Sequence, residues 1–380
     1  MLIQLFISFT LSEIAQPIHK VVIQGGEGGS KFYRIPSITM APDNKTLIIS
    51  ADKRWNSNAD LPSKIDTVIK YSKDNGVTWS EAITLSPGKA DPAGYGDPGL
   101  IVDRQIGAVF CLFTGHQGTF ASTKDKRQTN HYSVSHDNGV TWSPMIEITD
   151  MLYGTGCRDP IRQTLYSNFI TSGNGIQLRN GKLMIVGVGR RDETRTLYDF
   201  AVYSDDHGKT WSMTANSPVT SGGDESKVVE LNNGSILMSI RQSPNRLFSI
   251  SNDGGLTWGY PVAQNDILEP WCNGDIIRYT STKDGYNKNR LLHTIPYNTA
   301  GRKNLTIMVS YDEGNTWPVK KVIHPNSAAY SSVTFSPIDG KIYVFWERGG
   351  GVNGGFDLVV TTLTLDYITD GADTWTPPNT

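Results

Sequence analysis

One eight-residue phrase recurs five times along the chain and constrains its fold more than any other feature. The copies begin at Ser72, Ser135, Ser204, Ser251 and Ser310, and all follow the pattern Ser-x-Asp-x-Gly-x-Thr-Trp. They return about every 60 residues, a scale of self-similarity that indicates a repeat architecture, which in a β-rich chain is a propeller. Asp can bond the turn's backbone and Gly supplies a positive φ. Each copy is therefore predicted to be a hairpin turn between two outer strands of a blade, with its Thr and Trp wedged against the sheet.

Strand-like runs lie between the repeats, and helical periodicity is nowhere sustained. Those that lead into repeats are TVIKYS at 67–72, FAVYS at 200–204, LFSIS at 247–251 and LTIMVS at 305–310. After the last repeat, KIYVFW and LVVTTLTL suffice for a further blade, which an N-terminal strand such as KVVIQ would close. The sequence thus predicts an all-β fold, a six-bladed β-propeller of four-stranded antiparallel blades, over residues 20–370, with a C-terminal tail at 371–380.

Composition excludes several classes of partner. The 380 residues carry a net charge of about −2, so there is no basic excess that would favour nucleic acid. The three cysteines, Cys111, Cys157 and Cys272, form neither a CxxC pair nor an even set, and we expect buried thiols rather than a disulfide framework or a zinc site. The seven histidines show no paired metal-ligand spacing. No metal and no cofactor is predicted.

The N-terminus opens with an apolar run, MLIQLFISFTL, that is too short to span a bilayer. It lacks the positive residues that usually precede the apolar part of a secretory signal. We expect residues 1–19 to be a signal peptide, cut near Ala15, or a disordered terminus. The alternative is an ordinary first strand. The first interpretation implies a secreted or periplasmic protein, and the second a cytoplasmic one. No other segment approaches the length of a membrane span, and a monomer is expected.

Three arginines stand out because they lie at strand edges among apolar or small neighbours: Arg34 in FYRIPS, Arg241 in MSIRQS and Arg302 in AGRKNLTI. Taken one at a time, each could be a surface or salt-bridge residue. The planar guanidinium fork suits two-point binding of a carboxylate. Three converging guanidiniums would repel one another until an anion arrived, so together they indicate an anion site. We call these residues the arginine triad.

These features resemble the sialidase (neuraminidase) superfamily, of the bacterial and lysosomal type, from about residue 21 to 365. FYRIPS matches the family's F/Y-R-I-P motif near the N-terminus, and the five repeats match its Asp boxes. Asp boxes alone are unspecific, because other propellers carry them. Their combination with R-I-P and with correctly ordered downstream motifs is specific. The resemblance implies that the arginine triad grips the carboxylate of sialic acid and that Glu347, in YVFWERGG, holds Arg34 in place.

The resemblance also implies the reacting groups. Tyr330, in SAAYSSVTF, matches the catalytic tyrosine, and Glu225, in GGDESKVVEL, matches the glutamate beside it. Asp224 adjoins Glu225 and competes for that assignment. Sialic acid has a carboxylate on its anomeric carbon, so a neutral phenol avoids the repulsion that a carboxylate nucleophile would meet, an exception to the usual pair of carboxylates. Tyrosine has a free pKa of ~10 and needs a base at neutral pH.

Three further positions follow from the family pattern. Asp60, in NSNADLPSKID, matches the general acid and base, on a loop that is one residue longer than in some relatives. Asp66 competes with it, but it leads directly into a strand and is expected to be structural. Arg54 and Asp97 match positions that contact the 4-substituent of the sugar.

The resemblance therefore predicts an exo-α-sialidase that hydrolyses terminal sialic acid from sialylated glycans with retention of configuration. A trans-sialidase or an intramolecular trans-sialidase shares the same catalytic positions and remains an alternative. A third possibility is a non-catalytic Asp-box propeller that binds glycans or proteins. The complete set of Tyr, Glu, Asp and three Arg favours an enzyme.

Overall fold

The structure is a computed structural model that describes residues 14–86, 94–214 and 222–379. The fold is all-β, as predicted. Its helices are the short α1 (Thr149–Leu152) and α2 (Leu365–Ile368) and the 3-10 turns η1 (Glu27–Gly29), η2 (Arg162–Thr164), η3 (Thr282–Asp284) and η4 (Val352–Gly354). None of these helices is long and apolar enough to cross a membrane. The apolar run at the start of the predicted signal peptide lies outside the described residues.

Two of the sheets have four strands, joined in sequence order. The first consists of β2 (Phe32–Met40), β3 (Leu47–Arg54), β4 (Ile65–Ser72) and β5 (Ile83–Thr84). The second consists of β16 (Lys227–Glu230), β17 (Ile236–Ile240), β18 (Asn245–Ser251) and β19 (Val262–Leu268). All pairs in both are antiparallel. In each sheet, the strand that comes first in the chain is outermost on one side and the strand that comes last is outermost on the other.

Two other sheets have five strands because two-residue segments join them. One has the order β11 (Gly173–Asn174), β6 (Tyr95–Asp103), β7 (Ala108–His116), β8 (Gln128–Ser135) and β9 (Ile146–Glu147). The other has the order β10 (Ser167–Ile170), β13 (Leu183–Arg190), β14 (Tyr198–Ser204) and β15 (Ser212–Met213), with β12 (Ile176–Gln177) also on β13. The pairing of β11 with β6 is parallel.

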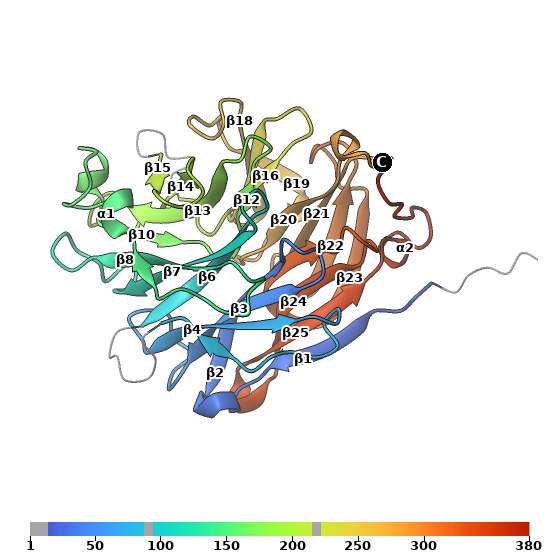
Figure 1. The fold of residues 1–380 in the computed structure, drawn as a ribbon, viewed down its shortest axis with the longest axis horizontal. Helices are drawn as coiled ribbons and strands as arrows, with labels where there is room; N and C mark the ends of the chain where they lie inside the picture. The colour runs from blue at the N-terminus through green and yellow to red at the C-terminus, as the bar shows by residue number, and fades with distance from the viewer. Residues whose placement is uncertain (1–13, 87–93, 215–221, 380) are drawn as a thin grey trace, which may run out of the picture.

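The last sheet has seven strands and contains both the first and the last strand of the described residues. Its order is β1 (Ile18–Ile23), β25 (Phe356–Leu363), β24 (Ile342–Gly349), β23 (Val319–Phe335), β22 (Lys303–Ser310), β21 (Arg290–Pro296) and β20 (Asp275–Thr280). The expected closing strand is present, because β1 pairs antiparallel with β25, and the two lie side by side in Figure 1. The sheets of the described residues thus have four, five or seven strands, and not four throughout.

The apolar core lies between neighbouring sheets. Where the sheet of β7 meets that of β14, Phe110 and Leu112 pack with Ile185, Phe200 and other fully buried side chains. Similar clusters lie between the other neighbours. The sheets curl past one another around the middle of the molecule (Figure 1). All three cysteines are buried and free, as predicted.

Each Asp box is a turn between two consecutive antiparallel strands, as predicted: β4 and β5, β8 and β9, β14 and β15, β18 and β19, and β22 and β23. In the second copy, Ser135 Oγ donates to Asp137 Oδ1 (2.9 Å) and accepts from the Gly139 N–H (2.8 Å). The Asp137 carboxylate also accepts from the N–H and hydroxyl of Thr141 (2.8 and 2.6 Å). Gly139 has a φ of 87°. The prediction for Thr was wrong, since Thr141 is exposed and bonded to Asp137 instead of wedged against the sheet.

Strand register places the boxes and the candidate site at opposite ends of the strands. We call these two ends the box edge and the site edge of the sheets. Along β3, Leu47 pairs with Met40 and with the box residue Ser72. Asp52 pairs with Arg34 at the other end. The boxes form turns at one end of the strands. They can therefore stabilise the fold without touching the candidate site residues at the other end.

We predict that Asp206→Ala in the third box lowers the free energy of unfolding by about 1–2 kcal/mol, the range for losing a capping side chain. Asp206 accepts three hydrogen bonds, from Ser204 and Thr210. Asp205 in the same box is a matched control, because it is exposed and makes only a 3.4 Å ion pair with Lys182. Urea unfolding that shows equal losses for Asp205→Ala and Asp206→Ala would contradict the structural role of the box aspartate.

Candidate active site

The arginine triad converges on one phenol. Arg34 lies in β2, Arg241 directly after β17 and Arg302 directly before β22. Their guanidinium carbons lie 5.0, 5.9 and 5.3 Å, respectively, from the ring centre of Tyr330 in β23. These three residues are widely separated in sequence, and the arrangement of the sheets alone brings them together. The result is a concentration of positive charge around one aromatic ring.

Glu347, in β24, is the buried counter-ion of Arg34. Its carboxylate accepts from Arg34 Nε (2.9 Å) and Nη2 (3.0 Å), and from the backbone N–H groups of Ile35 (2.9 Å) and Tyr330 (3.1 Å). Glu347 is fully buried. Burial alone would lower the pKa of Arg34, but the Glu347 carboxylate outweighs it and raises that pKa. Arg34 is therefore a permanent cation held in a fixed plane.

Glu225 joins Tyr330 to Arg241. The Tyr330 hydroxyl donates to Glu225 Oε2 at 2.5 Å and accepts from Arg241 Nη1 at 3.0 Å. Arg241 Nη1 also donates to the same Glu225 oxygen. Burial and the Glu225 charge raise the pKa of Tyr330 well above 10, although the arginine triad lowers it. The phenol is thus neutral at pH 7, with a carboxylate in position to take its proton.

Asp224 lies on the other side of Arg241. Its Oδ2 is 3.3 Å from Arg241 Nη1, and its Oδ1 accepts the N–H of Glu225 at 2.8 Å. Burial raises the pKa of Asp224 to about 6, with a further contribution from the charge of Glu225 and opposition from Arg241. Between the two competing carboxylates, Glu225 is the one that touches the phenol.

Arg302 is the least constrained member of the triad. Arg302 Nη2 donates to the carbonyl of Trp271, at 2.6 Å. Trp271 has a φ of 56°, in the left-handed region that bulky residues rarely occupy. Its indole is 46% exposed and borders a cavity of about 320 Å³ together with Arg195, Leu197 and Asp224. The orientation of Arg302 therefore depends on a strained backbone segment.

Asp60 lies on the loop between β3 and β4, with 77% of its side chain exposed. Its Oδ1 is 2.7 Å from Arg54 Nη2 and 4.0 Å from Arg34 Nη1. Loss of hydration alone would raise the pKa of Asp60. The positive charges of Arg54 and then Arg34 have the larger effect, so the pKa is lowered. The competitor Asp66 is buried and accepts from the Trp55 indole at 2.8 Å, which is a structural contact, as expected.

Arg54 and Asp97 meet at the buried Asp52 carboxylate. Arg54 donates to Asp52 Oδ2 through Nε (3.1 Å) and Nη2 (2.9 Å), and the Asp97 N–H donates to Oδ1 (2.9 Å). Asp97 has a φ of 56°. Burial, and then the charges of Asp52 and Glu225, raise the pKa of Asp97 well above its usual value. A Cβ at Gly96 would lie 2.8 Å from Asp52 Oδ1, so this approach requires glycine.

All nine predicted site residues therefore lie at the edge opposite the boxes, linked to one another directly or through Asp52. The sequence reasoning missed Asp52 and Trp271. Asp52 is two residues before Arg54 on the same strand, so the period of two places both side chains on one face, which is a usable signal. Nothing in the local sequence marks Trp271. In the part of the chain that the structure describes, no group of three or more His, Cys, Asp or Glu side chains could hold a metal ion.

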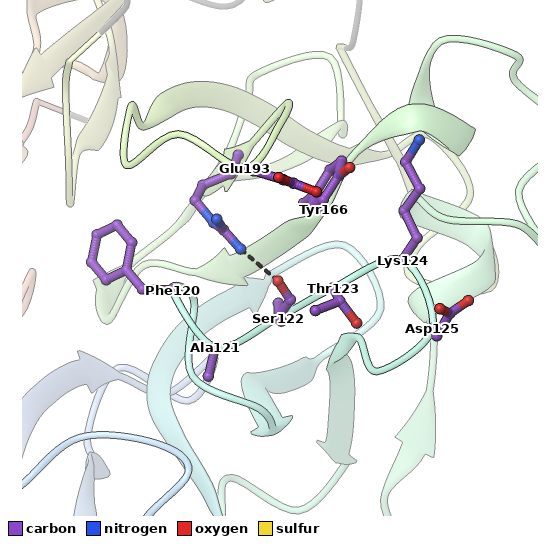
Figure 2. A pocket seen from close by; sticks show the side chains of 9 residues that line it. Phe120, Ala121, Ser122, Thr123, Lys124, Asp125, Tyr166 and Glu193 are labelled. Carbon is purple, nitrogen blue, oxygen red and sulfur yellow. Dashed lines mark hydrogen bonds between the residues drawn. The ribbon is translucent and has the colours of Figure 1, made fainter.

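A second cavity, of about 390 Å³, opens at the same edge of the sheets. Phe120, Lys124, Tyr166 and Glu193 are among the residues that line it (Figure 2). Arg190, also part of its wall, donates to the carbonyl of Ser122 at 2.6 Å. The other hydrogen bonds of this guanidinium also go to backbone carbonyls. It ties two loops together.

Comparison with known proteins agrees with this geometry. Residues 54–344 match the family model described as a BNR repeat-like domain. The sialidase of Micromonospora viridifaciens is 35% identical over 350 residues, covering 86% of this chain and 51% of that protein. The sialidase of Clostridium perfringens is 30% identical over 311 residues, covering 75% of this chain and 76% of that protein. The sialidase of Bacteroides fragilis is 29% identical and covered to 56%.

Solved structures show the same fold. The Hadza microbial sialidase Hz136 superposes with a TM-score of 0.79 at 26% identity, covering 90% of this chain and 68% of that one. The intramolecular trans-sialidase of Ruminococcus gnavus gives 0.77 at 20% identity, covering 92% and 98%. The fold and the family model thus define a BNR-repeat protein, in which three guanidiniums surround one phenol. The chain belongs to the sialidase family, and it spans about half the length of the first two relatives, those of M. viridifaciens and B. fragilis.

We predict that Glu347→Ala lowers the free energy of unfolding by about 3–5 kcal/mol, because it leaves Arg34 buried without its counter-ion. The matched control is Asp357→Ala, which removes the partner of the partly exposed Arg348 on the adjoining strand (2.8 Å) and is expected to cost less than about 1 kcal/mol. Denaturant unfolding of both variants checks this. Similar losses in the two would show that Arg34 does not depend on Glu347.

Proposed function

We propose that this protein is an exo-α-sialidase, a retaining glycoside hydrolase that releases terminal sialic acid from glycoproteins, glycolipids and oligosaccharides. The observation that carries the proposal is the triad of guanidiniums around a phenol that is hydrogen-bonded to a carboxylate. A sugar that carries a carboxylate on its anomeric carbon satisfies both parts. Its carboxylate would bind the three guanidiniums, and its anomeric carbon would then lie near the phenol.

The proposed nucleophile is Tyr330 and its base is Glu225. As the Tyr330 oxygen forms a bond to the anomeric carbon, the glycosidic bond breaks and the phenolic proton passes to Glu225 across 2.5 Å. The three guanidinium groups around the ring stabilise the phenolate character that develops. The transition state resembles an oxocarbenium ion, and binding of the carboxylate by the arginine triad can offset the cost of flattening the sugar ring.

The proposed general acid is Asp60. Its exposure lets it reach the leaving oxygen, but Arg54 keeps its pKa low in the free protein. A general acid must hold its proton when the glycosidic bond breaks. Asp60 therefore has to gain a proton when the substrate binds. Binding favours this, because the substrate carboxylate offsets the charge of Arg34 and the bound sugar excludes water. After the leaving group departs, Asp60 takes a proton from an incoming water, whose oxygen bonds to the anomeric carbon as the bond between that carbon and the Tyr330 oxygen breaks. Glu225 returns its proton to the phenolate, and two displacements at the same carbon give net retention.

Arg54 and Asp97 are proposed to contact the 4-hydroxyl of the sugar. The raised pKa of Asp97 favours a protonated carboxyl, which can donate a hydrogen bond as well as accept one. Arg54 is tied to Asp52, Asn58 and Asp60, which fixes its plane before the ligand arrives. The site is therefore preorganised on the side of the ring that carries this hydroxyl.

We also propose that the sheets form a six-bladed propeller. The seven-stranded sheet divides at β23, whose first half pairs with β22 and whose second half pairs with β24. Division there yields β20 to β23 as one blade and β23, β24, β25 and β1 as another. The two-residue segments β11 and β12 would then be bridges to the inner strands. Each inner strand begins at the candidate site.

A transfer reaction is the second candidate. The exposed side chain of Trp271, whose backbone carbonyl accepts from Arg302, offers an apolar surface that would exclude water and favour another acceptor. Localisation follows from the substrate, since sialylated glycans are extracellular, and we propose a secreted or periplasmic monomer.

We expect Tyr330→Phe to lower turnover of a fluorogenic aryl sialoside by at least about 1,000-fold, since it removes the attacking oxygen. The matched control is Tyr343→Phe, which removes a buried hydroxyl that has no hydrogen-bond partner in the described part of the chain. NMR of the wild-type reaction should show the α-anomer first. Full turnover by Tyr330→Phe, or first release of the β-anomer, would contradict the mechanism.

We expect Arg302→Gln to raise KM and to lower kcat/KM for the same sialoside by about 10- to 100-fold, the loss for one charge-assisted hydrogen bond. Lys303→Gln is the control, because Lys303 is the exposed neighbour on the same strand edge. Steady-state kinetics of the two variants decide the matter. Equal constants in both would remove Arg302 from the site.

A further inference from the structure

A buried ion pair lies beneath the site and has no place in the chemistry described above. Arg246, in β18, and Glu269, on the segment after β19, are both fully buried. Arg246 Nη1 lies 3.7 Å from Glu269 Oε2. Burying two charges is costly, and such a pair is weak evidence for stability by itself. Its hydrogen bonds indicate a different use.

The pair grips both sides of one residue, Cys272. Arg246 Nη1 donates to the Cys272 carbonyl at 3.0 Å, and Glu269 Oε1 accepts the Cys272 N–H at 2.5 Å. Cys272 directly follows Trp271, the residue whose backbone is in the left-handed region. A strained conformation persists only where its surroundings over-determine it. The ion pair supplies that restraint, and it thereby fixes the carbonyl that accepts from Arg302.

The same guanidinium also reaches the proposed base. Arg246 Nη2 donates to the Glu225 carbonyl at 3.3 Å, while Nε donates to Ser239 Oγ at 3.0 Å. One fixed fork thus touches the backbone of Glu225 and the segment that holds Arg302. Glu225 and Arg302 are far apart in sequence, and no hydrogen bond of the described residues joins them directly.

We propose that Arg246, with Glu269, is a positioning residue that sets the distance between the proton acceptor Glu225 and the carboxylate-binding Arg302. This inference rests on the proposed function. A lysine at position 246 keeps the charge but has no fork, so it cannot hold both backbone segments at once. Its loss therefore disturbs the geometry of the site, and not only the stability of the core.

The test compares Arg246→Lys with Arg290→Lys. Arg290 is a matched control, because it is also fully buried and paired with a carboxylate, Asp373 (2.7 Å), but it lies at the box edge of the sheets. Both variants should lower Tm. Only Arg246→Lys should lower kcat/KM for the fluorogenic sialoside, by about 10- to 100-fold, the effect of an ångström-scale displacement in a site.

A second readout separates positioning from stability. Free sialic acid and its C1 methyl ester are compared as inhibitors of each variant, and the ratio of their inhibition constants reports how well the arginine triad meets a carboxylate. We expect that ratio to fall at least about fivefold in Arg246→Lys and to stay unchanged in Arg290→Lys. Unchanged kcat/KM and an unchanged ratio in a folded Arg246→Lys would overturn the proposal.

If Arg246→Lys does not fold, Glu269→Gln replaces it, because Gln keeps the acceptor for the Cys272 N–H and removes only the charge. The same two readouts then apply, with the same expected directions, and no change in either overturns the proposal. A wrong proposed function would give a different result from a wrong positioning role, because the wild-type protein itself would then hydrolyse no sialoside.

Discussion

The site depends on the Glu347 carboxylate, which accepts four N–H groups from two different strands. Glu347 holds both the guanidinium of Arg34, in β2, and the backbone of Tyr330, in β23. It thereby joins the four-stranded sheet of β2 to the seven-stranded sheet of β23. Because Glu347 is fully buried, this contact is shielded from solvent. The spacing between the carboxylate-binding group and the phenol is thus fixed before any ligand binds.

Charge balance explains why the arrangement suits an acidic sugar. Glu347 neutralises Arg34, and Glu225 with Asp224 neutralises Arg241, whereas Arg302 is bonded to a neutral carbonyl. One guanidinium therefore faces the site without a carboxylate of its own among the described ion pairs. In the proposed function, the carboxylate of the substrate supplies the missing charge. The phenol beside it stays neutral until Glu225 takes its proton, so the anion can approach without repulsion.

Much of this could be predicted from the sequence, and the remainder has a physical reason. The boxes are local, since Ser135, Asp137 and Thr141 bond within one turn, and the closing strand was expected because the last two runs needed one more strand to complete a blade. The triad was singled out by its apolar and small neighbours, whereas Tyr330 was found only through the family motifs. Arg246 and Glu269 were missed because their role is made of backbone contacts between distant segments. The sheets of five and seven strands were not predicted, because two-residue bridges such as β11 leave no pattern in a sequence.

The most direct test of the account is to find which side chain bonds to the sugar. The protein is incubated with a 3-fluorinated sialosyl fluoride, whose fluorine next to the anomeric centre slows breakdown of a glycosyl intermediate, and the digested adduct is mapped by mass spectrometry. The account predicts one sialyl group on the peptide that contains Tyr330, attached through its phenolic oxygen. Attachment to Glu225 or Asp60 would contradict it.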